Sequence, residues 1–227
     1  MYFSRLTLNP QRRQAKHLVA DARAMHAAVE AAFPPSMAGS ETRNLWRLDR
    51  MEHEVILYVV SPQRPDLRHI QEQAGWESAP AESTDYERFL GSIQRGQRYS
   101  FRLAANPVKR QFVPGGRGRI LPHVTEAQQV TWLMARAEGW GFTVRPVQTL
   151  QETAAGDVDL PPDVRVVHRN DGHFRKTDES GNRTVTQRQV TFVGSLEVLE
   201  ANKLRESLTR GMGRGKAYGL GLMTLAR

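Results

Sequence analysis

The sequence predicts an α+β fold in two halves, each with the same order of strands and helices. Segments in which apolar and polar residues alternate, as in half-buried strands, flank segments with apolar residues at helical spacing. The order of these segments in the second half repeats the order in the first. The chain of 227 residues is long enough for one large or two small domains, and its 39% content of hydrophobic residues supports a folded core.

The first half opens with a strand and then a helix. Residues 2–9 alternate between apolar and polar side chains, and Pro10 follows them. After a basic polar stretch, Asp21 is a suitable N-cap for an alanine-rich helix, because its carboxylate can accept hydrogen bonds from the first free amides. We expect this helix to end at Pro34.

Two further strands and a second helix complete the first half. Residues 44–50 and 54–60 are strand-like and are joined by a short polar link, which predicts a β-hairpin. Residues 62–73 have room for a short helix. The order in this half is therefore strand, helix, strand, strand, helix.

The second half follows the same order and ends on a strand. Residues 97–106 alternate, and Thr125 begins a segment with apolar residues at helical spacing. The remaining predicted elements are strands at 142–150 and 184–199, a helix at 202–210 and a closing strand at 217–226.

The order strand, helix, strand, strand, helix, strand is that of the ferredoxin-like fold. We therefore predict two tandem ferredoxin-like domains, an N-terminal one at residues 1–92 and a C-terminal one at residues 97–227. The polar segment at 152–182 shows no apolar period, and we expect it to be a loop.

Charge points to a polyanionic partner. The formal net charge is +8, a balance typical of nucleic-acid-binding proteins. The chain has no cysteine, which excludes disulfides and thiolate zinc sites. No apolar run approaches the ~18 residues of a membrane-spanning helix, and the N-terminus turns polar too early for a signal peptide. We expect a cytoplasmic protein without a membrane partner.

A basic stretch carries much of this charge. Residues 88–125 contain eight Arg and Lys and no Asp or Glu, with Gly115-Gly116 near the middle. A basic β-hairpin or loop with a glycine turn suits phosphate binding, whereas a solvated basic surface is the usual role of a charge run. The candidate RNA-binding residues here are Arg102, Lys109, Arg110, Arg117 and Arg119.

A second basic segment is rich in glycine. Residues 211–223 read GMGRGKAYGLGLM, and glycine permits close approach of backbone to a ligand. A P-loop would need glycine at position 210 and Ser or Thr at 217, where Arg210 and Ala217 stand, and the dinucleotide fingerprint fails as well. A phosphate-binding role outside these motifs remains. Its candidate residues are Gly211, Gly213, Arg214, Gly215, Lys216 and Tyr218.

Several segments resemble the CasE family of CRISPR RNA-processing endoribonucleases, a subunit of the type I-E Cascade complex. The resemblance spans nearly the whole chain and is weakest at 152–182. It rests on MYFSRLTLNP (1–10), MHAAVEAAFP (25–34), FRLAANPVKR (101–110) and GSLEVLEANKLRESLTRGMGRGKAYGLGLMTLA (194–226).

The resemblance implies two ferredoxin-like domains and a metal-independent endoribonuclease without a cofactor. Such an enzyme cleaves precursor RNA 3′ of the repeat stem-loop through attack by the 2′-OH. This leaves a 2′,3′-cyclic phosphate, and the enzyme keeps the product. The implied partners are the CRISPR repeat stem-loop and other Cascade subunits, and we expect a monomer in isolation. The alternative is a non-catalytic subunit that only binds the RNA stem-loop.

The resemblance also implies the catalytic residues. His26 matches the active-site histidine of the family, and an imidazole suits proton transfer near neutrality. From the residues alone, a structural, partly buried histidine would be favoured. Arg23 stands where the family often has tyrosine, and arginine cannot exchange protons at ordinary pH. We expect Arg23 to stabilise phosphorane charge, with a plain surface arginine as the alternative. Arg165 and Arg169 either contact RNA or belong to a solvated loop.

Overall fold

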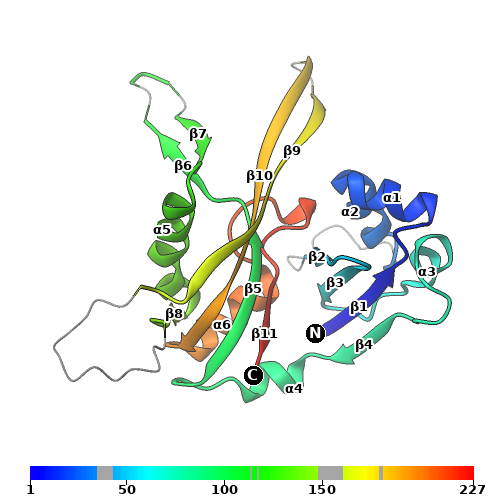
Figure 1. Ribbon diagram of the computed structural model, residues 1–227, viewed down its shortest axis with the longest axis horizontal. Helices are drawn as coiled ribbons and strands as arrows, with labels where there is room; N and C mark the ends of the chain where they lie inside the picture. The colour runs from blue at the N-terminus through cyan, green and yellow to red at the C-terminus, as the bar shows by residue number, and fades with distance from the viewer. Residues whose placement is uncertain (35–42, 113, 117, 148–160, 179–180) are drawn as a thin grey trace. The chain divides into compact units, whose positions relative to one another are not determined.

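The computed structural model describes residues 1–34, 43–112, 114–116, 118–147, 161–178 and 181–227 (Figure 1). Packing divides the chain into two compact units. The first unit contains residues 1–93 and 205–222, and the second contains residues 94–204 and 223–227. Residues 211–222 of the glycine-rich segment therefore belong to the first unit, whereas the sequence analysis assigned them to the C-terminal domain.

The first unit contains a four-stranded antiparallel sheet in the order β2-β3-β1-β4. Helices α1, α2 and α3 pack on one face of it, where Met25, Val29 and Ile70 meet Leu6 and Leu57 in a buried core. The elements are β1 (Tyr2–Leu8), α1 (Arg13–Ala20), α2 (Ala22–Glu30), β2 (Leu45–Arg50), β3 (Val55–Ser61), α3 (Arg68–Ala74), β4 (Glu82–Asp85) and α4 (Glu87–Ser92).

The predicted elements of the first half are confirmed, with three additions, α1, β4 and α4. The Asp21 carboxylate accepts hydrogen bonds from the amides of Arg23 and Ala24 at 2.8 and 3.3 Å, so it caps α2 as expected. The predicted β-hairpin is the antiparallel pair β2–β3. Helices α1 and α4 and strand β4 were not predicted. Helix α1 buries only Ala15 and Leu18, which leaves little apolar period in its sequence.

The second unit contains a sheet in the order β11-β5-β10-β8, with β9 added on β10. Its first helix begins as predicted at Thr125, which forms a capping box with Gln128. The elements are β5 (Arg98–Ala105), β6 (Val108–Gln111), β7 (Arg119–Pro122), α5 (Glu126–Ala137), η1 (Glu138–Trp140), β8 (Phe142–Val144), β9 (Val164–Asp178), β10 (Gly181–Val198), α6 (Ala201–Arg210) and β11 (Met223–Ala226). The division between units falls inside α6.

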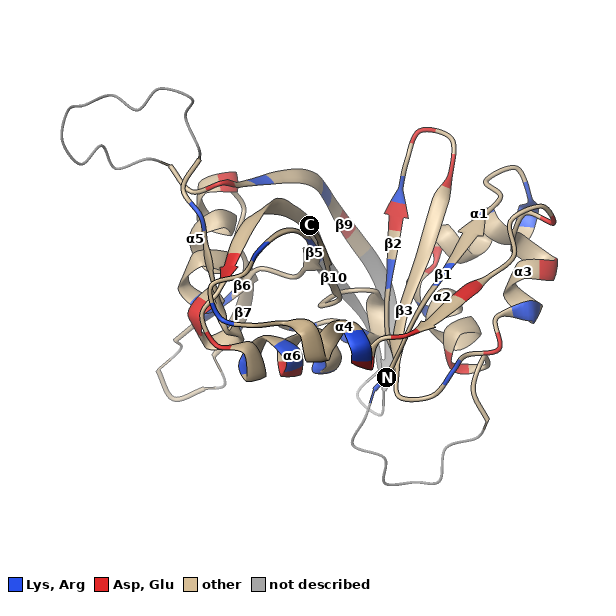
Figure 2. Ribbon diagram, turned by 90° about the horizontal axis from the view of Figure 1, so that it is seen from below, with Lys and Arg blue, Asp and Glu red and all other residues tan. Residues whose placement is uncertain are grey.

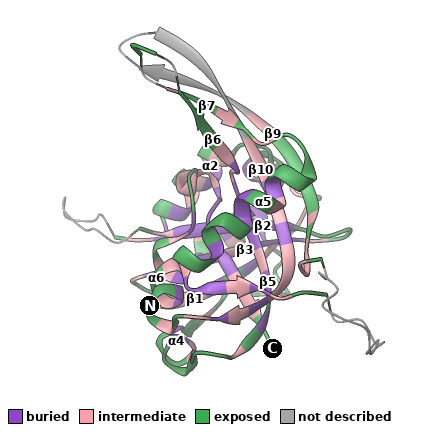
Figure 3. Cartoon of the chain, turned by 90° about the vertical axis from the view of Figure 1, so that its left-hand side faces the viewer, coloured by how far each residue is buried: buried purple, intermediate pink, exposed green. Residues whose placement is uncertain are grey.

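Both sheets have the ferredoxin-like strand order. Within each unit the fourth strand lies beside the first, the first beside the third, and the third beside the second. Buried residues concentrate on the strands of the two sheets and on the inner faces of the helices (Figure 3). The predicted α+β fold with two ferredoxin-like modules is therefore confirmed.

The expectation of a loop at 152–182 is wrong for its described second part. Residues 164–178 form the long strand β9, which runs antiparallel to β10 with pairs such as Asn170 opposite Gln189. Backbone hydrogen bonds to β10 hold this strand, and none of its side chains at 164–172 is buried. Its sequence therefore lacks the alternation on which the prediction relied. Residues 148–160 lie outside the described residues.

Two smaller differences concern neighbouring segments. The strand predicted at 142–150 ends at Val144, close to Pro146, which has no amide to donate to a ladder. The basic stretch contains the β6–β7 hairpin, with Gly115 in its turn at a φ of 70°. The prediction of a hairpin or loop with a glycine turn is therefore confirmed in its hairpin form.

Candidate active site and RNA-binding surface

Helix α2 places three polar side chains along one stripe. Arg23, His26 and Glu30 are spaced by three and four residues, so they share a face, while Met25 and Val29 point into the core. Arg23 is exposed in the first turn, and His26 is half-buried at the edge of the core. The cap at Asp21 fixes where the helix begins and thereby sets the phase of this stripe.

The two nitrogens of the His26 ring have different surroundings. Nδ1 is buried, has no hydrogen-bond partner among the described residues, and lies 3.8 Å from Glu30 Oε1. Glu30 Oε2 accepts a hydrogen bond of 3.1 Å from the side-chain amide of Asn44. The His26 side chain as a whole is 36% exposed, although Nδ1 is buried. The arrangement puts the Glu30 carboxylate on the Nδ1 side of the His26 ring.

The glycine-rich segment packs against the same helix. Its 3-10 helix η2 (Lys216–Tyr218) contacts both α2 and β2 within the first unit. Gly219 has a φ of +77°, and a Cβ there would lie 2.5 Å from the Trp46 ring. A Cβ on Gly211, also at +77°, would lie 2.8 Å from Leu45 Cδ2. These glycines let the segment lie flat on β2, which brings η2 next to the helix of His26.

The predicted residues of the glycine-rich segment thus differ in their surroundings. Packing against Leu45 accounts for the glycine at Gly211 without any ligand. Arg214 is exposed, whereas Lys216 and Tyr218 are half-buried in η2. Gly213 and Gly215 also have positive φ angles, of 75° and 85°. The structure therefore brings Lys216 and Tyr218 to the unit that contains His26 and Arg23.

The remaining predicted RNA-binding residues lie in the second unit. Those on strands β6, β7 and β9 are exposed, and Arg102 on β5 is half-buried. Figure 2 colours Lys and Arg blue, and such segments lie on β9 as well as on helices such as α3 and α6. The exposed residues are Lys109, Arg110, Arg119, Arg165 and Arg169. Arg117 lies outside the described residues.

His123 lies at the end of the β6–β7 hairpin, near two cationic side chains. Burial lowers the pKa of His123, and the nearby charges of Lys109 and Arg136 lower it further. The hairpin therefore ends near the positive charges of Lys109 and Arg136. Sequence reasoning did not select His123, although it lies within the basic stretch.

Sequence reasoning also missed Glu30, Arg43 and Arg210. Glu30 follows His26 by four residues, a spacing that brings side chains together on a helix, so this pair had a readable signal. Arg43 and Arg210 have no such signal, because folding alone brings them beside Lys216.

Two features of the described residues bear on metal ions and membranes. No group of three or more His, Cys, Asp or Glu that could hold a metal ion occurs among them. None of the described helices combines the length and apolar character needed to cross a membrane.

Comparisons with known proteins cover the full chain. The model of a family described as CRISPR associated protein matches residues 1–227. The CRISPR-associated endoribonuclease Cse3 of Thermus thermophilus is 32% identical over 235 residues, with 100% of both chains covered. A structure of CRISPR endoribonuclease Cse3 bound to a 19-nucleotide RNA matches with a TM-score of 0.79 at 28% identity, with 100% of both chains covered. Cas6e from Escherichia coli K-12 shares the fold, with a TM-score of 0.64 at 22% identity over 100% of this chain and 99% of that chain.

Proposed function

The chain belongs to the family of CRISPR associated proteins, as a CasE-type endoribonuclease related to Cse3, and on this premise we propose that it processes CRISPR precursor RNA. It cleaves the RNA 3′ of the repeat stem-loop and keeps the stem-loop product within Cascade. The observation that carries the proposal is the stripe of Arg23, His26 and Glu30 on α2, with the basic helix η2 packed against it.

The proposed reaction needs no nucleophile from the protein. The 2′-oxygen forms a bond to the adjacent phosphorus, and the bond from phosphorus to the 5′-oxygen breaks. One proton leaves the 2′-OH and one is delivered to the 5′-oxygen, so the products are a 2′,3′-cyclic phosphate and a free 5′-OH. Orientation, proton transfer and charge stabilisation are the tasks left to side chains, and none of them requires a metal ion.

His26 is the proton-transfer residue of this proposal. Its Nε2 exchanges the proton with the RNA, while the carboxylate of Glu30, 3.8 Å from Nδ1, stabilises the imidazolium. Arg23, one turn away, stabilises the negative charge that develops on the phosphorane. The exposed cations of the β6–β7 hairpin and of β9 bind stem phosphates, which makes affinity mostly electrostatic.

The second candidate is a subunit that binds the RNA stem-loop without cutting it. The observation that favours it is Arg23, since the family often has a tyrosine there and arginine cannot replace its hydroxyl as an acid or base.

One experiment separates the two candidates. The purified protein is incubated in excess EDTA with a repeat stem-loop RNA, beside a copy that carries a 2′-deoxy nucleotide at the cut. We expect cleavage of the first RNA only, and loss of cleavage without loss of binding in His26→Ala. Tight binding without cleavage of either RNA would establish the non-catalytic alternative. Cleavage that appears only after a metal ion is added would contradict metal independence.

A further inference from the structure

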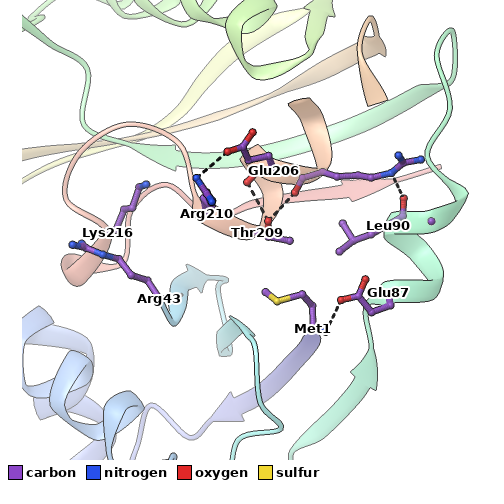
Figure 4. Close-up of a pocket in the computed structure, with 10 residues that line it drawn as sticks. Met1, Arg43, Glu87, Leu90, Glu206, Thr209, Arg210 and Lys216 are labelled. Carbon is purple, nitrogen blue, oxygen red and sulfur yellow. Dashed lines mark hydrogen bonds and ion pairs between the residues drawn. The ribbon is translucent and has the colours of Figure 1, made fainter. Parts of the chain in front are cut away.

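A pocket of about 1040 Å³ opens in the first unit, between α4, α6 and the glycine-rich segment (Figure 4). This volume is at the upper end of the range for small-ligand sites. The pocket therefore has room for a segment of a polymer as well as for a single ion. The residues that line it are Met1, Arg43, Glu87, Leu90, Gly91, Arg205, Glu206, Thr209, Arg210 and Lys216.

The two carboxylates of the pocket already have partners. Glu206 pairs with Arg210 at 3.0 Å, and Glu87 pairs with the amine of Met1 at 2.8 Å. Arg205 donates to the backbone carbonyls of Leu90 and Ile93, so it is fixed in the pocket wall.

Arg43 and Lys216 are different, because neither has a carboxylate partner in the part of the chain that the structure describes. Figure 4 shows their side chains beside each other at one end of the pocket, with Arg210 close to them. Burial lowers the pKa of Lys216, and the charges of Arg43 and Arg210 lower it further. Three cations with one carboxylate among them form a site whose repulsion an anion would relieve.

The character of the pocket wall identifies the anion. None of the lining residues is aromatic, so the pocket offers no surface on which a base could stack. Arg and Lys are the side chains that hold phosphate, and backbone phosphates are recognised without regard to sequence. A concave pocket can enclose a single strand of nucleic acid, whereas the convex surface of a duplex does not fit into it.

The position of Lys216 connects the pocket to the proposed chemistry. Lys216 is the first residue of η2, and η2 packs on α2, which carries His26. We propose that Arg43, Arg210 and Lys216 bind a backbone phosphate of the single-stranded RNA that follows the stem-loop, on the 3′ side of the scissile phosphate. This inference rests on the proposed function and adds to it a site for the strand that leaves after cleavage.

The test compares two RNAs that both carry a 2′-deoxy nucleotide at the cut, so that neither is cleaved. One ends at the first nucleotide after the cut, and the other continues for about six nucleotides. We expect the full-length protein to bind the longer RNA about tenfold more tightly, as one or two further phosphate contacts provide. Arg43→Ala should remove most of this gain and leave the Kd for the shorter RNA within about twofold. Lys216→Ala should likewise remove most of the gain.

Arg64→Ala is the matched control, because Arg64 is an exposed arginine of the same unit that does not line the pocket. It should keep the full gain, and replacing the flank by a different sequence should also keep it. Equal affinity of the wild-type protein for both RNAs would overturn the proposal, and so would a loss in the pocket variants that is the same for both RNAs. Failure of the wild-type protein to bind even the shorter RNA would instead overturn the proposed function.

Discussion

Arg47 donates a hydrogen bond of 3.0 Å from Nη1 to the backbone carbonyl of Leu222, and so ties β2 to the end of the glycine-rich segment. Its Nε and Nη2 donate to the two carboxylate oxygens of Asp49, both at 2.8 Å. The side chains are only 1% and 5% exposed. The position of η2 beside α2 therefore depends partly on a buried, fully oriented guanidinium.

Asp49→Ala tests this anchor. Removing one partner of a buried ion pair leaves the other charge uncompensated, and the expected loss in unfolding free energy is about 3–5 kcal/mol. The double variant Arg47→Met/Asp49→Leu should recover most of the loss, because no buried charge remains. The measurement is urea unfolding followed by circular dichroism. A loss below about 1 kcal/mol in Asp49→Ala would show that Arg47 finds another partner or reaches solvent.

Gly219→Ala tests the close packing of the glycine-rich segment on β2. Alanine at a φ of +77° is strained, and its Cβ would meet the Trp46 ring at 2.5 Å. Gly96→Ala is the matched control, since Gly96 has a φ of +83° but no atom within 4 Å of the added Cβ. We expect a loss of about 1–2 kcal/mol in the control from strain alone. The loss should be larger by about 1–3 kcal/mol in Gly219→Ala because of overpacking. Equal losses in the two variants would mean that Trp46 moves aside freely.

The strand and helix order was predictable because most elements combine a local pattern with a local punctuation signal. Strand β1 alternates up to Pro10, α2 begins at the cap Asp21, and α5 begins at Thr125. Strand β9 was not predictable in this way, because none of its side chains at 164–172 is buried. An alternation of apolar and polar residues arises where one face of a strand is buried. A strand with mostly polar side chains has little such alternation.

The candidate site was predictable residue by residue but not as an assembly. His26 and Arg23 followed from the resemblance, and Lys216 from its place among glycines and cations. That η2 packs on the helix of His26 depends on contacts of Gly219 with Trp46 and of Arg47 with Leu222, which join distant parts of the chain. No pattern local to either segment contains that information.

Arg23 is expected to act through its charge. Arg23→Lys keeps a cation one turn from His26 and should leave the cleavage rate nearly unchanged, whereas Arg23→Ala should lower it by about 10²-fold, as for the loss of one group that stabilises transition-state charge. Single-turnover rates at saturating protein separate this effect from binding. An unchanged rate in Arg23→Ala would remove Arg23 from the site and leave it a surface arginine.

The β6–β7 hairpin is expected to contribute to the salt dependence of RNA binding. Arg110 on β6 and Arg119 on β7 are exposed, so each can neutralise one phosphate. Replacing either by alanine should reduce the slope of log affinity against log salt by about 0.7–0.9. The measurement is the Kd for the stem-loop RNA at several salt concentrations, with Arg64→Ala as the control. Slopes equal to that of the wild-type protein would place the RNA away from this hairpin.

Lys216 is expected to make the binding of the 3′ flank sensitive to alkaline pH. Burial and the charges of Arg43 and Arg210 lower the pKa of Lys216 below the ordinary value of 10.5. The carboxylate of the pocket near these cations is Glu206, which is paired with Arg210. A depressed pKa means that Lys216 loses its proton, and the pocket loses a cation, as pH rises from neutrality toward that value.

The tighter binding of the longer RNA should therefore decline over this pH range in the wild-type protein. Lys216→Arg should retain it, because a guanidinium stays protonated. Dividing the Kd of the shorter RNA by that of the longer RNA at each pH removes effects that the two RNAs share. Parallel pH curves for the wild-type protein and Lys216→Arg would show that Lys216 does not hold the flank phosphate. At neutral pH the two proteins should bind the longer RNA equally well, because both then carry the charge.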